Sequence, residues 1–278
     1  MPDTADEADD RDAPDDVQAK IDTSVAHPAR VYDYWLGGKD NFAADREAAE
    51  RVLAVTPGLR ERVLANRAFL ARATRYLAAE AGIRQFLDIG TGIPAASNTH
   101  EVAQAVAPDS RIVYVDNDPI VLVHAKALLA SGPQGATQYV DGDIRDAGPI
   151  LEAASATFDF SQPIGLMLLG ILHLIQDSED PYRVVAGLMD GLPSGSYLAL
   201  SHPASDFNRV AQAEAQRRYN ERVSTPQTLR TRAEVARFFD GLELVPPGVV
   251  YVHTWRPDPG DVVPADGRSA HGGVARKP

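Results

Sequence analysis

The stretch RQFLDIGTGIPAAS, from Arg84 to Ser97, decides the fold of this chain. A short apolar run leads into Asp88, and Gly90 and Gly92 follow with one residue between them. A run of this kind predicts a buried strand, and glycines directly after it permit a tight turn and the close approach of a ligand. The pattern therefore predicts a strand that ends in a ligand-binding loop.

Beyond this loop, strand and helix patterns alternate along the chain. The run at 163–172 is almost wholly apolar, which is typical of a parallel strand buried on both faces. Repeated strand–helix units predict an α/β fold with a parallel sheet, helices on both faces and right-handed crossovers. The last segments, 242–255 and 272–278, are expected to add antiparallel strands at one edge. The five parallel strands are expected at 84–89, 111–116, 136–143, 163–172 and 195–202.

The region before this alternation divides into two parts. The first 20 residues hold eight acidic and two basic side chains, so they carry −6 of the net charge of −12, with few large apolar residues. Residues 1–25 are therefore predicted to be a disordered acidic tail. Residues 26–82 are predicted to form an N-terminal helical extension before a main domain over 83–278. A polar helix is also expected over 206–223, and its role is left open.

Helix boundaries in the extension are predicted from capping residues. Asp40 or Asn41 can cap a helix over about 42–54. Thr56 and Pro57 are expected to start the next helix, and Gly82 to end it.

Composition excludes several classes of function. The chain has no cysteine, which excludes disulfides, thiolate zinc sites and a cysteine nucleophile, and its histidine spacing does not favour a metal site.

No apolar run reaches the roughly 20 residues of a membrane span, and the acidic start is unlike a signal peptide. We expect a soluble, cytoplasmic protein with no membrane partner. The mildly acidic body also argues against nucleic acid as a partner. Nothing indicates the oligomeric state.

Two cofactor classes use a glycine loop of this kind. Gly90, Gly92 and Ala95 satisfy the dinucleotide pattern G-x-G-x-x-G/A, which favours NAD(P). However, Asp88 would repel a pyrophosphate, and Pro94 lacks an N–H for a phosphate oxygen.

S-adenosylmethionine carries no phosphate. Its cationic amino-acid end suits the carboxylate of Asp88. Asp116, after the second strand, can accept hydrogen bonds from both ribose hydroxyls. Asp118 precedes Pro119 and is assigned the helix cap, which leaves Asp116 available. Asp143 can accept from the adenine amino group, with Ile144 against the ring.

Three motifs support the second class. LDIGTG (87–92), VYVDNDP (113–119) and GDIRD (142–146) resemble the first three motifs of class I S-adenosylmethionine-dependent methyltransferases. Segments from about His27 to Pro278 also resemble an actinobacterial methyltransferase family of largely unassigned substrate. The resemblance implies a Rossmann-like fold with a mostly parallel seven-stranded sheet and an antiparallel C-terminal edge. It implies cofactor contacts from Asp88, Gly90, Thr91, Gly92, Asp116, Asn117, Asp143, Ile144 and Gly170.

The methyl acceptor is less well indicated. In this fold the end of the fourth strand usually faces the methyl group, so His173 is a candidate base; the alternative is a half-buried histidine at a strand–helix junction. Tyr32 and Tyr34 are candidate substrate contacts or simply packing residues. Arg67 either reaches the cofactor carboxylate or lies on the surface. The helix at 206–223 is either a lid or a solvated face.

Two chemistries can be set aside. No Asn/Asp-Pro-Pro-aromatic motif follows the fourth strand, and no cysteine is present for pyrimidine carbon methylation. Oxygen or nitrogen methylation of a small molecule is therefore expected. The alternatives are an NAD(P)-dependent oxidoreductase and a non-catalytic S-adenosylmethionine sensor.

Overall fold

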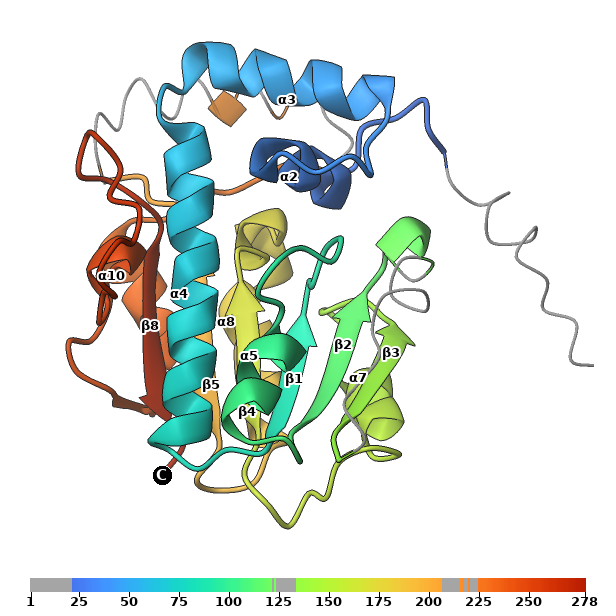
Figure 1. Cartoon of the computed structure of the whole chain (residues 1–278), viewed down its shortest axis with the longest axis vertical. Helices are drawn as coiled ribbons and strands as arrows, with labels where there is room; N and C mark the ends of the chain where they lie inside the picture. The colour runs from blue at the N-terminus through green and yellow to red at the C-terminus, as the bar shows by residue number, and fades with distance from the viewer. Residues whose placement is uncertain (1–21, 122, 124–133, 207–215, 218–219, 221–224) are drawn as a thin grey trace, which may run out of the picture.

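A mixed sheet forms the centre of the molecule (Figure 1). The computed structural model describes residues 22–121, 123, 134–206, 216–217, 220 and 225–278. The strand order is β3-β2-β1-β4-β5-β8-β6, and β7 also pairs with β8. The order brings the carboxyl ends of β1, β2 and β4 together, at the edge where open α/β sheets bind ligands. The parallel strands, all close to their predicted positions, are β1 (Gln85–Ile89), β2 (Arg111–Asp116), β3 (Ala136–Asp141), β4 (Gly165–Leu169) and β5 (Tyr197–His202).

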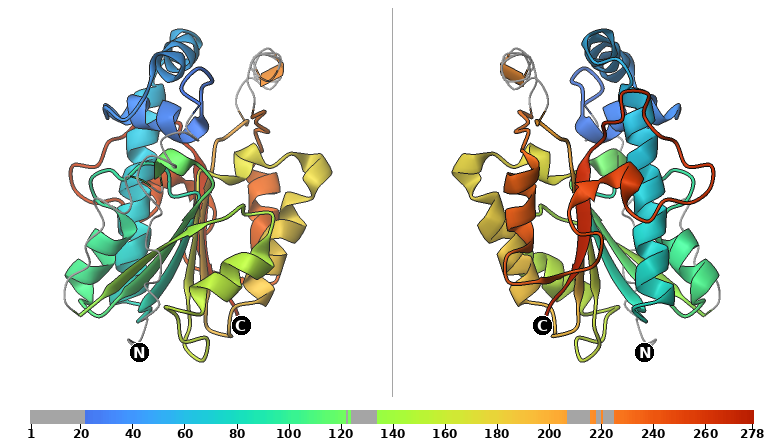
Figure 2. Two further views of the ribbon diagram at one scale, coloured as in Figure 1. Left: turned by 90° about the vertical axis from the view of Figure 1, so that its right-hand side faces the viewer. Right: turned by 90° about the vertical axis from the view of Figure 1, so that its left-hand side faces the viewer.

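Helices cover both faces of the sheet (Figure 2). One face packs against α4 (Leu59–Ala79) and α5 (Thr99–Val106). The opposite face packs against α7 (Ala147–Ala154), α8 (Pro181–Asp190) and α10 (Arg232–Ala236). Each face buries its own apolar core, because alternate side chains of every strand point to opposite sides. The predicted helices on both faces are thus confirmed.

The C-terminal edge is antiparallel, as predicted, but it contains one more strand than the expected seven-stranded sheet. β8 (His271–Arg276) lies antiparallel to β5 and pairs His271 with His202. Two strands of two residues each, β6 (Glu243–Leu244) and β7 (Val250–Tyr251), pair with opposite ends of β8. Pro246 and Pro247 lie between them and have no N–H for a ladder. The predicted edge strand is therefore split in two.

The N-terminal extension begins with α2 (Pro28–Leu36) and α3 (Ala43–Val55), which lie above the carboxyl ends of the strands (Figure 1). The predicted caps Asp40 and Asn41 are wrong for α3. The Phe42 N–H instead donates to Asp45 Oδ2 at 2.8 Å. The Asp40 N–H and the Asn41 side chain both donate to Asp33 Oδ2, because this carboxylate organises the turn that follows α2.

The predicted start at Thr56-Pro57 is wrong, because α4 begins after Gly58, whose φ of 77° suits glycine at this bend.

The tail over residues 1–25 and the polar helix over 206–223 lie mostly outside the described residues. The division into an extension over 26–82 and a main domain over 83–278 stays a prediction. Within the described part of the chain, no helix is long and apolar enough to cross a membrane.

Candidate functional site

The glycine loop turns directly after β1. Gly90 and Gly92 have φ values of 76° and 66°, and the Gly90 N–H donates to Val115 O of β2 at 2.8 Å. A Cβ at Gly90 would lie 2.6 Å from the Ile171 side chain, whereas a Cβ at Gly92 would meet nothing within 4 Å. Gly90 is therefore required by its packing and its backbone conformation. Gly92 lines open space at the sheet edge.

Asp116 ties this loop to the end of β2. Its Oδ2 accepts the Gly92 N–H at 2.8 Å, and its Oδ1 accepts the Asp118 N–H at 3.0 Å. Burial raises the pKa of Asp116, while these two backbone hydrogen bonds oppose the rise. Each carboxylate oxygen retains a second lone pair. The structure therefore leaves Asp116 able to accept ligand hydroxyls while it holds the loop in place.

Asp88 lies beneath the same loop and is only 5% exposed. Its Oδ2 accepts a hydrogen bond from Thr99 Oγ1 at 2.6 Å, and its backbone carbonyl accepts from Thr91 Oγ1 at 3.0 Å. Burial raises the pKa of Asp88 to about 6, although the Thr99 hydrogen bond and the nearby Arg67 charge oppose it. Arg67 donates to the Ala96 carbonyl at 2.8 Å, so this arginine lies against the glycine loop.

A third carboxylate, Asp143, follows β3. Asn117 Nδ2 lies 3.5 Å from Asp143 Oδ2, so the structure brings these two predicted contacts together. Arg145 also donates to Asp143 Oδ1 at 3.0 Å. Ile144 is 5% exposed and belongs to the apolar core on the α7 side of the sheet. Little of its surface is left for an adenine ring.

The N-terminal extension packs over these loops. Ala29 and Phe42 contact an apolar cluster formed by Ile93 of the glycine loop with Ile120 and Val121, which follow Asp118. Asp118 Oδ1 accepts the Ile120 N–H at 3.0 Å, which confirms its predicted capping role.

The other oxygen of Asp118 faces the extension. Asp118 Oδ2 lies 2.7 Å from His27 Nδ1 and 3.6 Å from Arg30 Nε. Burial would raise the pKa of Asp118, but the hydrogen bond and charge of His27, with smaller effects from Ile120 and Arg30, lower it overall.

A hydrogen-bonded chain crosses the ends of β4 and β5. Ser201 Oγ donates to Asn66 Oδ1 at 2.6 Å, and Asn66 Nδ2 donates to Tyr32 Oη at 3.2 Å. Gly170 lies beside this chain with a φ of 72°, and a Cβ there would be 3.5 Å from Asn66 Nδ2. Tyr32 is therefore placed at the strand ends. Asn66 and Ser201 were not predicted, because no local motif marks either residue.

Tyr34 has different surroundings from Tyr32. Its hydroxyl donates to Glu50 Oε1 of α3 at 2.5 Å, and the Arg60 guanidinium lies 5.3 Å from the ring centre. Tyr34 therefore joins α2, α3 and α4 and is not part of the chain that contains Tyr32.

His173 lies just after β4 in a short 3-10 helix, Leu172–Leu174. Its ring meets the His202 ring edge-on with centres 6.2 Å apart, and its Nδ1 is buried without a hydrogen-bond partner. Burial, with a smaller effect of the Arg230 charge, lowers the pKa of His173 to about 4. The imidazole is therefore neutral at physiological pH, with a free lone pair, and is a weaker base than an ordinary histidine.

Tyr139 of β3 supplies a further polar group at the site. Its ring stacks on Tyr114 with centres 5.1 Å apart, and its hydroxyl is buried without a partner. Burial raises the pKa of Tyr139, and the charges of Asp88 and Asp116 add to the rise, so the hydroxyl stays protonated. A hydrogen-bond donor thus lies close to two carboxylates. Among the described residues no group of His, Asp or Glu side chains could hold a metal ion.

Comparisons with known proteins find a matching family and similar solved structures. The profile of the S-adenosyl methyltransferase family matches residues 14–278. The crystal structure of a DUF574 family protein from Streptomyces avermitilis MA-4680 is similar, with a TM-score of 0.88 and 48% identity over 92% of this chain and 99% of that chain. A candidate methyltransferase from Thermobifida fusca YX has a TM-score of 0.82 and 44% identity, over 92% of this chain and 96% of that chain. No curated protein matches the chain.

Proposed function

Because this chain belongs to the S-adenosyl methyltransferase family, we propose that it methylates an oxygen or nitrogen atom of a small molecule. The family decides the reaction class: the chain is an S-adenosylmethionine-dependent methyltransferase, and the nicotinamide-dependent and sensor alternatives are set aside. The N-terminal extension supports a small-molecule acceptor. Its helix α2 is held across the strand ends by the contact of His27 with Asp118 and by the hydrogen bond of Tyr32 with Asn66. A small acceptor suits a covered site better than a folded macromolecule does. We also propose a cytoplasmic location.

The residues at the sheet edge fit S-adenosylmethionine. Gly92 opens onto space that a Cβ would enter, and the Tyr139 hydroxyl is a buried donor without a partner. We assign the loop Gly90–Gly92, with Thr91, to the backbone contacts with the cofactor. Asp116 and Asn117 would bind the ribose hydroxyls, and Asp143 would accept from the adenine amino group. Ile144, which is mostly buried in the core, would offer the adenine ring only its small remaining surface. Asp88 and Arg67 carry opposite charges near the loop, which matches a zwitterionic amino-acid end.

Few groups of the protein need to take part in the chemistry. The bound sulfonium supplies an electrophilic methyl group, and positioning of the acceptor carries most of the rate enhancement. We propose that His173 accepts the proton that an acceptor hydroxyl or amine loses, because its imidazole is neutral and lies after β4. Tyr32, oriented by Asn66 and beside Gly170, would contact the acceptor. Tyr34 would act through the packing of α2, given its bond to Glu50.

Calorimetric titration tests this proposal first. S-adenosylmethionine and its demethylated product should bind with micromolar Kd, and NAD should not bind; the reverse result would overturn the cofactor assignment. A screen of small hydroxyl and amine compounds, with release of S-adenosylhomocysteine as readout, then tests the acceptor class. Methylation of protein or nucleic acid, with none of any small molecule, would contradict the acceptor part alone.

A further inference from the structure

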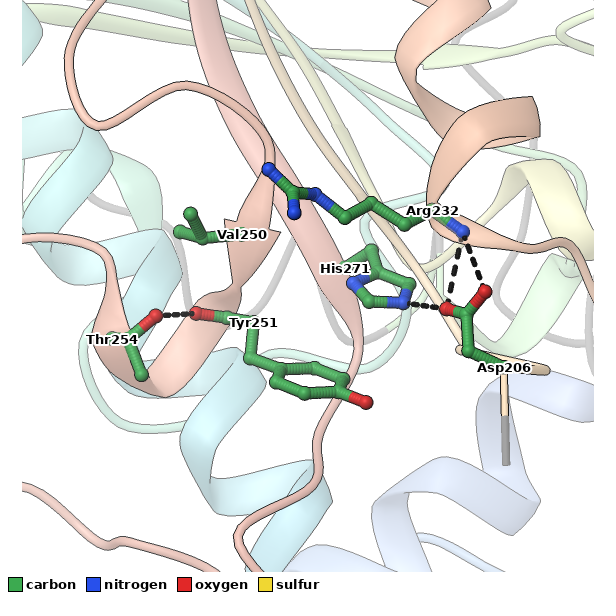
Figure 3. Close-up of a pocket in the computed structure, with 6 residues that line it drawn as sticks. All are labelled: Asp206, Arg232, Val250, Tyr251, Thr254 and His271. Atoms are coloured by element: carbon green, nitrogen blue, oxygen red, sulfur yellow. Dashed lines mark hydrogen bonds and ion pairs between the residues drawn. The ribbon is translucent and has the colours of Figure 1, made fainter. Parts of the chain in front are cut away.

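A pocket with a volume of 440 Å³ lies at the same sheet edge as the cofactor residues but on the side of β8 (Figure 3). None of its residues belongs to the cofactor set or to the chain that contains Tyr32. His271 begins β8 and pairs across the ladders with both His202 of β5 and Tyr251 of β7. The pocket is lined by Asp206, Arg232, Val250, Tyr251, Thr254 and His271.

Asp206 fixes the tautomer of His271. The carboxylate contacts His271 Nε2 and also accepts the Arg232 backbone N–H, at 3.2 and 3.1 Å from its two oxygens (Figure 3). An ionised carboxylate only accepts hydrogen bonds, so Nε2 carries the proton and Nδ1 presents a lone pair. Burial lowers the pKa of His271. The hydrogen bond and charge of Asp206 raise this pKa and the Arg232 charge lowers it, and the net shift is downward, so the ring is neutral at physiological pH.

His271 Nδ1 lacks a partner although it is buried. The residue is 3% exposed, and no group in the described chain donates to this nitrogen. An unsatisfied buried acceptor costs roughly 1–3 kcal/mol. A ligand in the pocket that donates a hydrogen bond to Nδ1 would recover this free energy.

Arg232 supplies a positive charge to the same pocket. Its Nε donates to the Val249 carbonyl at 2.7 Å, which orients the guanidinium. Its terminal nitrogens form no hydrogen bond or ion pair within the described chain. A ligand group that suits both side chains has an O–H for Nδ1 and an oxygen that can bear negative charge for the guanidinium. An ammonium group would be repelled by Arg232, and a carboxylate lacks the proton that Nδ1 requires.

We propose that this pocket is a specificity subsite that binds a phenol-type hydroxyl at the far end of the methyl acceptor. The proposal rests on the small-molecule acceptor of the proposed function. β8 is two strands from β4, a separation of roughly 10 Å at the usual strand spacing. The hydroxyl bound here is therefore distinct from the atom that receives the methyl group. His271 and Arg232 position the acceptor, and Val250 and Tyr251 contribute apolar surface beside it.

The test uses 4-nitrophenol as the probe and the full chain saturated with S-adenosylhomocysteine. The phenol and its phenolate absorb at different wavelengths, so binding can be followed by absorbance. Saturable binding is expected, with nitrobenzene, which lacks the hydroxyl, at least about tenfold weaker. Equal binding of the two compounds, or no saturable binding of the phenol, would overturn the subsite.

Matched variants assign the binding to this pocket. Arg232→Gln and His271→Gln should each weaken 4-nitrophenol binding about 10- to 100-fold, the range of a lost hydrogen bond to a charged group or a buried acceptor. Arg183→Gln on α8, an exposed arginine that does not line the pocket, is the control and should bind like wild type. Unchanged affinity in Arg232→Gln, an exposed position where folding is not at risk, would overturn the proposal.

Two further measurements separate this proposal from the proposed function. Each variant is titrated with S-adenosylhomocysteine, whose affinity should stay within about twofold; if the wild-type chain does not bind it, the cofactor assignment fails instead. In ¹⁵N spectra of the histidines, 4-nitrophenol should shift the Nδ1 signal of His271, and a signal that does not move would overturn the assigned contact. For an identified acceptor, Arg232→Gln should raise KM with little change in kcat.

Discussion

His27 Nδ1 lies 2.7 Å from Asp118 Oδ2, and this contact joins the N-terminal extension to the turn that follows β2. The Asp118 backbone N–H in turn donates to Asp116, the carboxylate that holds the glycine loop. The extension and the cofactor loops are thus connected through Asp116 and Asp118, two acidic residues separated by Asn117. A change at His27 should therefore affect both the stability of the extension and the binding of the cofactor.

Asp118→Asn should destabilise the chain by about 1–3 kcal/mol, because it removes a buried charge-assisted pair and leaves Arg30 without that partner. Glu47→Gln is the control, since Glu47 pairs with Arg51 on the surface of α3 and such a pair contributes little. Urea unfolding measures the difference, and protease cleavage within α2 and α3 reports loosening. Equal stability of the two variants would show that the pair does not hold the extension.

The same carboxylate gives a pH dependence. The pKa of Asp118 is lower in the folded state, so its contribution is present above the ordinary pKa of an aspartate and is lost as pH falls through the lower folded value. The difference in free energy of unfolding between Asp118→Asn and the wild type should therefore disappear in acid. A deficit that is the same at pH 7 and pH 3 would contradict the assignment.

Asp88 should behave in the opposite way. Its folded pKa is raised to about 6, so its contribution to stability is fully present below the ordinary aspartate pKa and is lost as pH rises through about 6. Asp88→Asn should then stabilise the ligand-free chain at pH 7.5 by up to about 3 kcal/mol and have little effect at pH 4. It should also weaken S-adenosylmethionine binding. Urea unfolding at both pH values checks the first part, and a variant less stable than wild type at pH 7.5 would refute it.

Asp116→Ala should weaken binding of S-adenosylhomocysteine by about 1–3 kcal/mol, the scale of hydrogen bonds to a charged group. Asp141→Ala offers a matched control, because Asp141 pairs with Asp116 across the β2–β3 ladder but is exposed. Titration calorimetry should show a loss only for the first variant. If both variants bind like wild type, Asp116 has no direct role with the cofactor.

The two loop glycines should respond differently to alanine. Gly90→Ala forces a Cβ against Ile171 at a positive φ, which should cost about 2–4 kcal/mol of folding stability. Gly92→Ala meets no atom of the protein, so its cost should be about 1–2 kcal/mol, from the backbone alone. Its larger effect should be on cofactor affinity, because the added Cβ enters the space assigned to the ligand. Unfolding and titration of both variants test this contrast, and the reverse order of effects would contradict it.

His173→Gln tests the proposed base once an acceptor is identified. The expected loss in kcat is about 10²- to 10⁴-fold, with cofactor affinity unchanged. Because burial lowers the pKa of His173 to about 4, this group should give no inflection in the pH–rate profile between pH 6 and 8. Wild-type kcat in the variant would leave His173 as a half-buried histidine at a strand–helix junction.

Local sequence patterns predicted much of this structure. The apolar run at β4 and the cap at Asp118 before Pro119 were predictable, because burial and capping depend on a few neighbouring residues. The capping of α3 was not predictable, since Asp40 and Asn41 are drawn to Asp33 by the preceding turn. The bond from Ser201 to Asn66 joins residues 135 positions apart, and the contact of His271 with Asp206 spans 65. Such pairs depend on the order of strands in the sheet, which neither segment encodes alone.

The reversed direction of β8 has a consequence for how the acceptor range of such an enzyme can diversify. Most residues expected to contact the cofactor follow β1, β2 and β3, whereas the residues that line the pocket come from segments after β5. Because β8 runs antiparallel, its first residue, His271, lies at the edge where the other strands end. Insertions or substitutions in the segments that lead into β7 and β8 can therefore reshape the pocket and leave the residues after β1, β2 and β3 unchanged. Such changes would alter the proposed acceptor subsite and leave the residues proposed to bind the methyl donor in place.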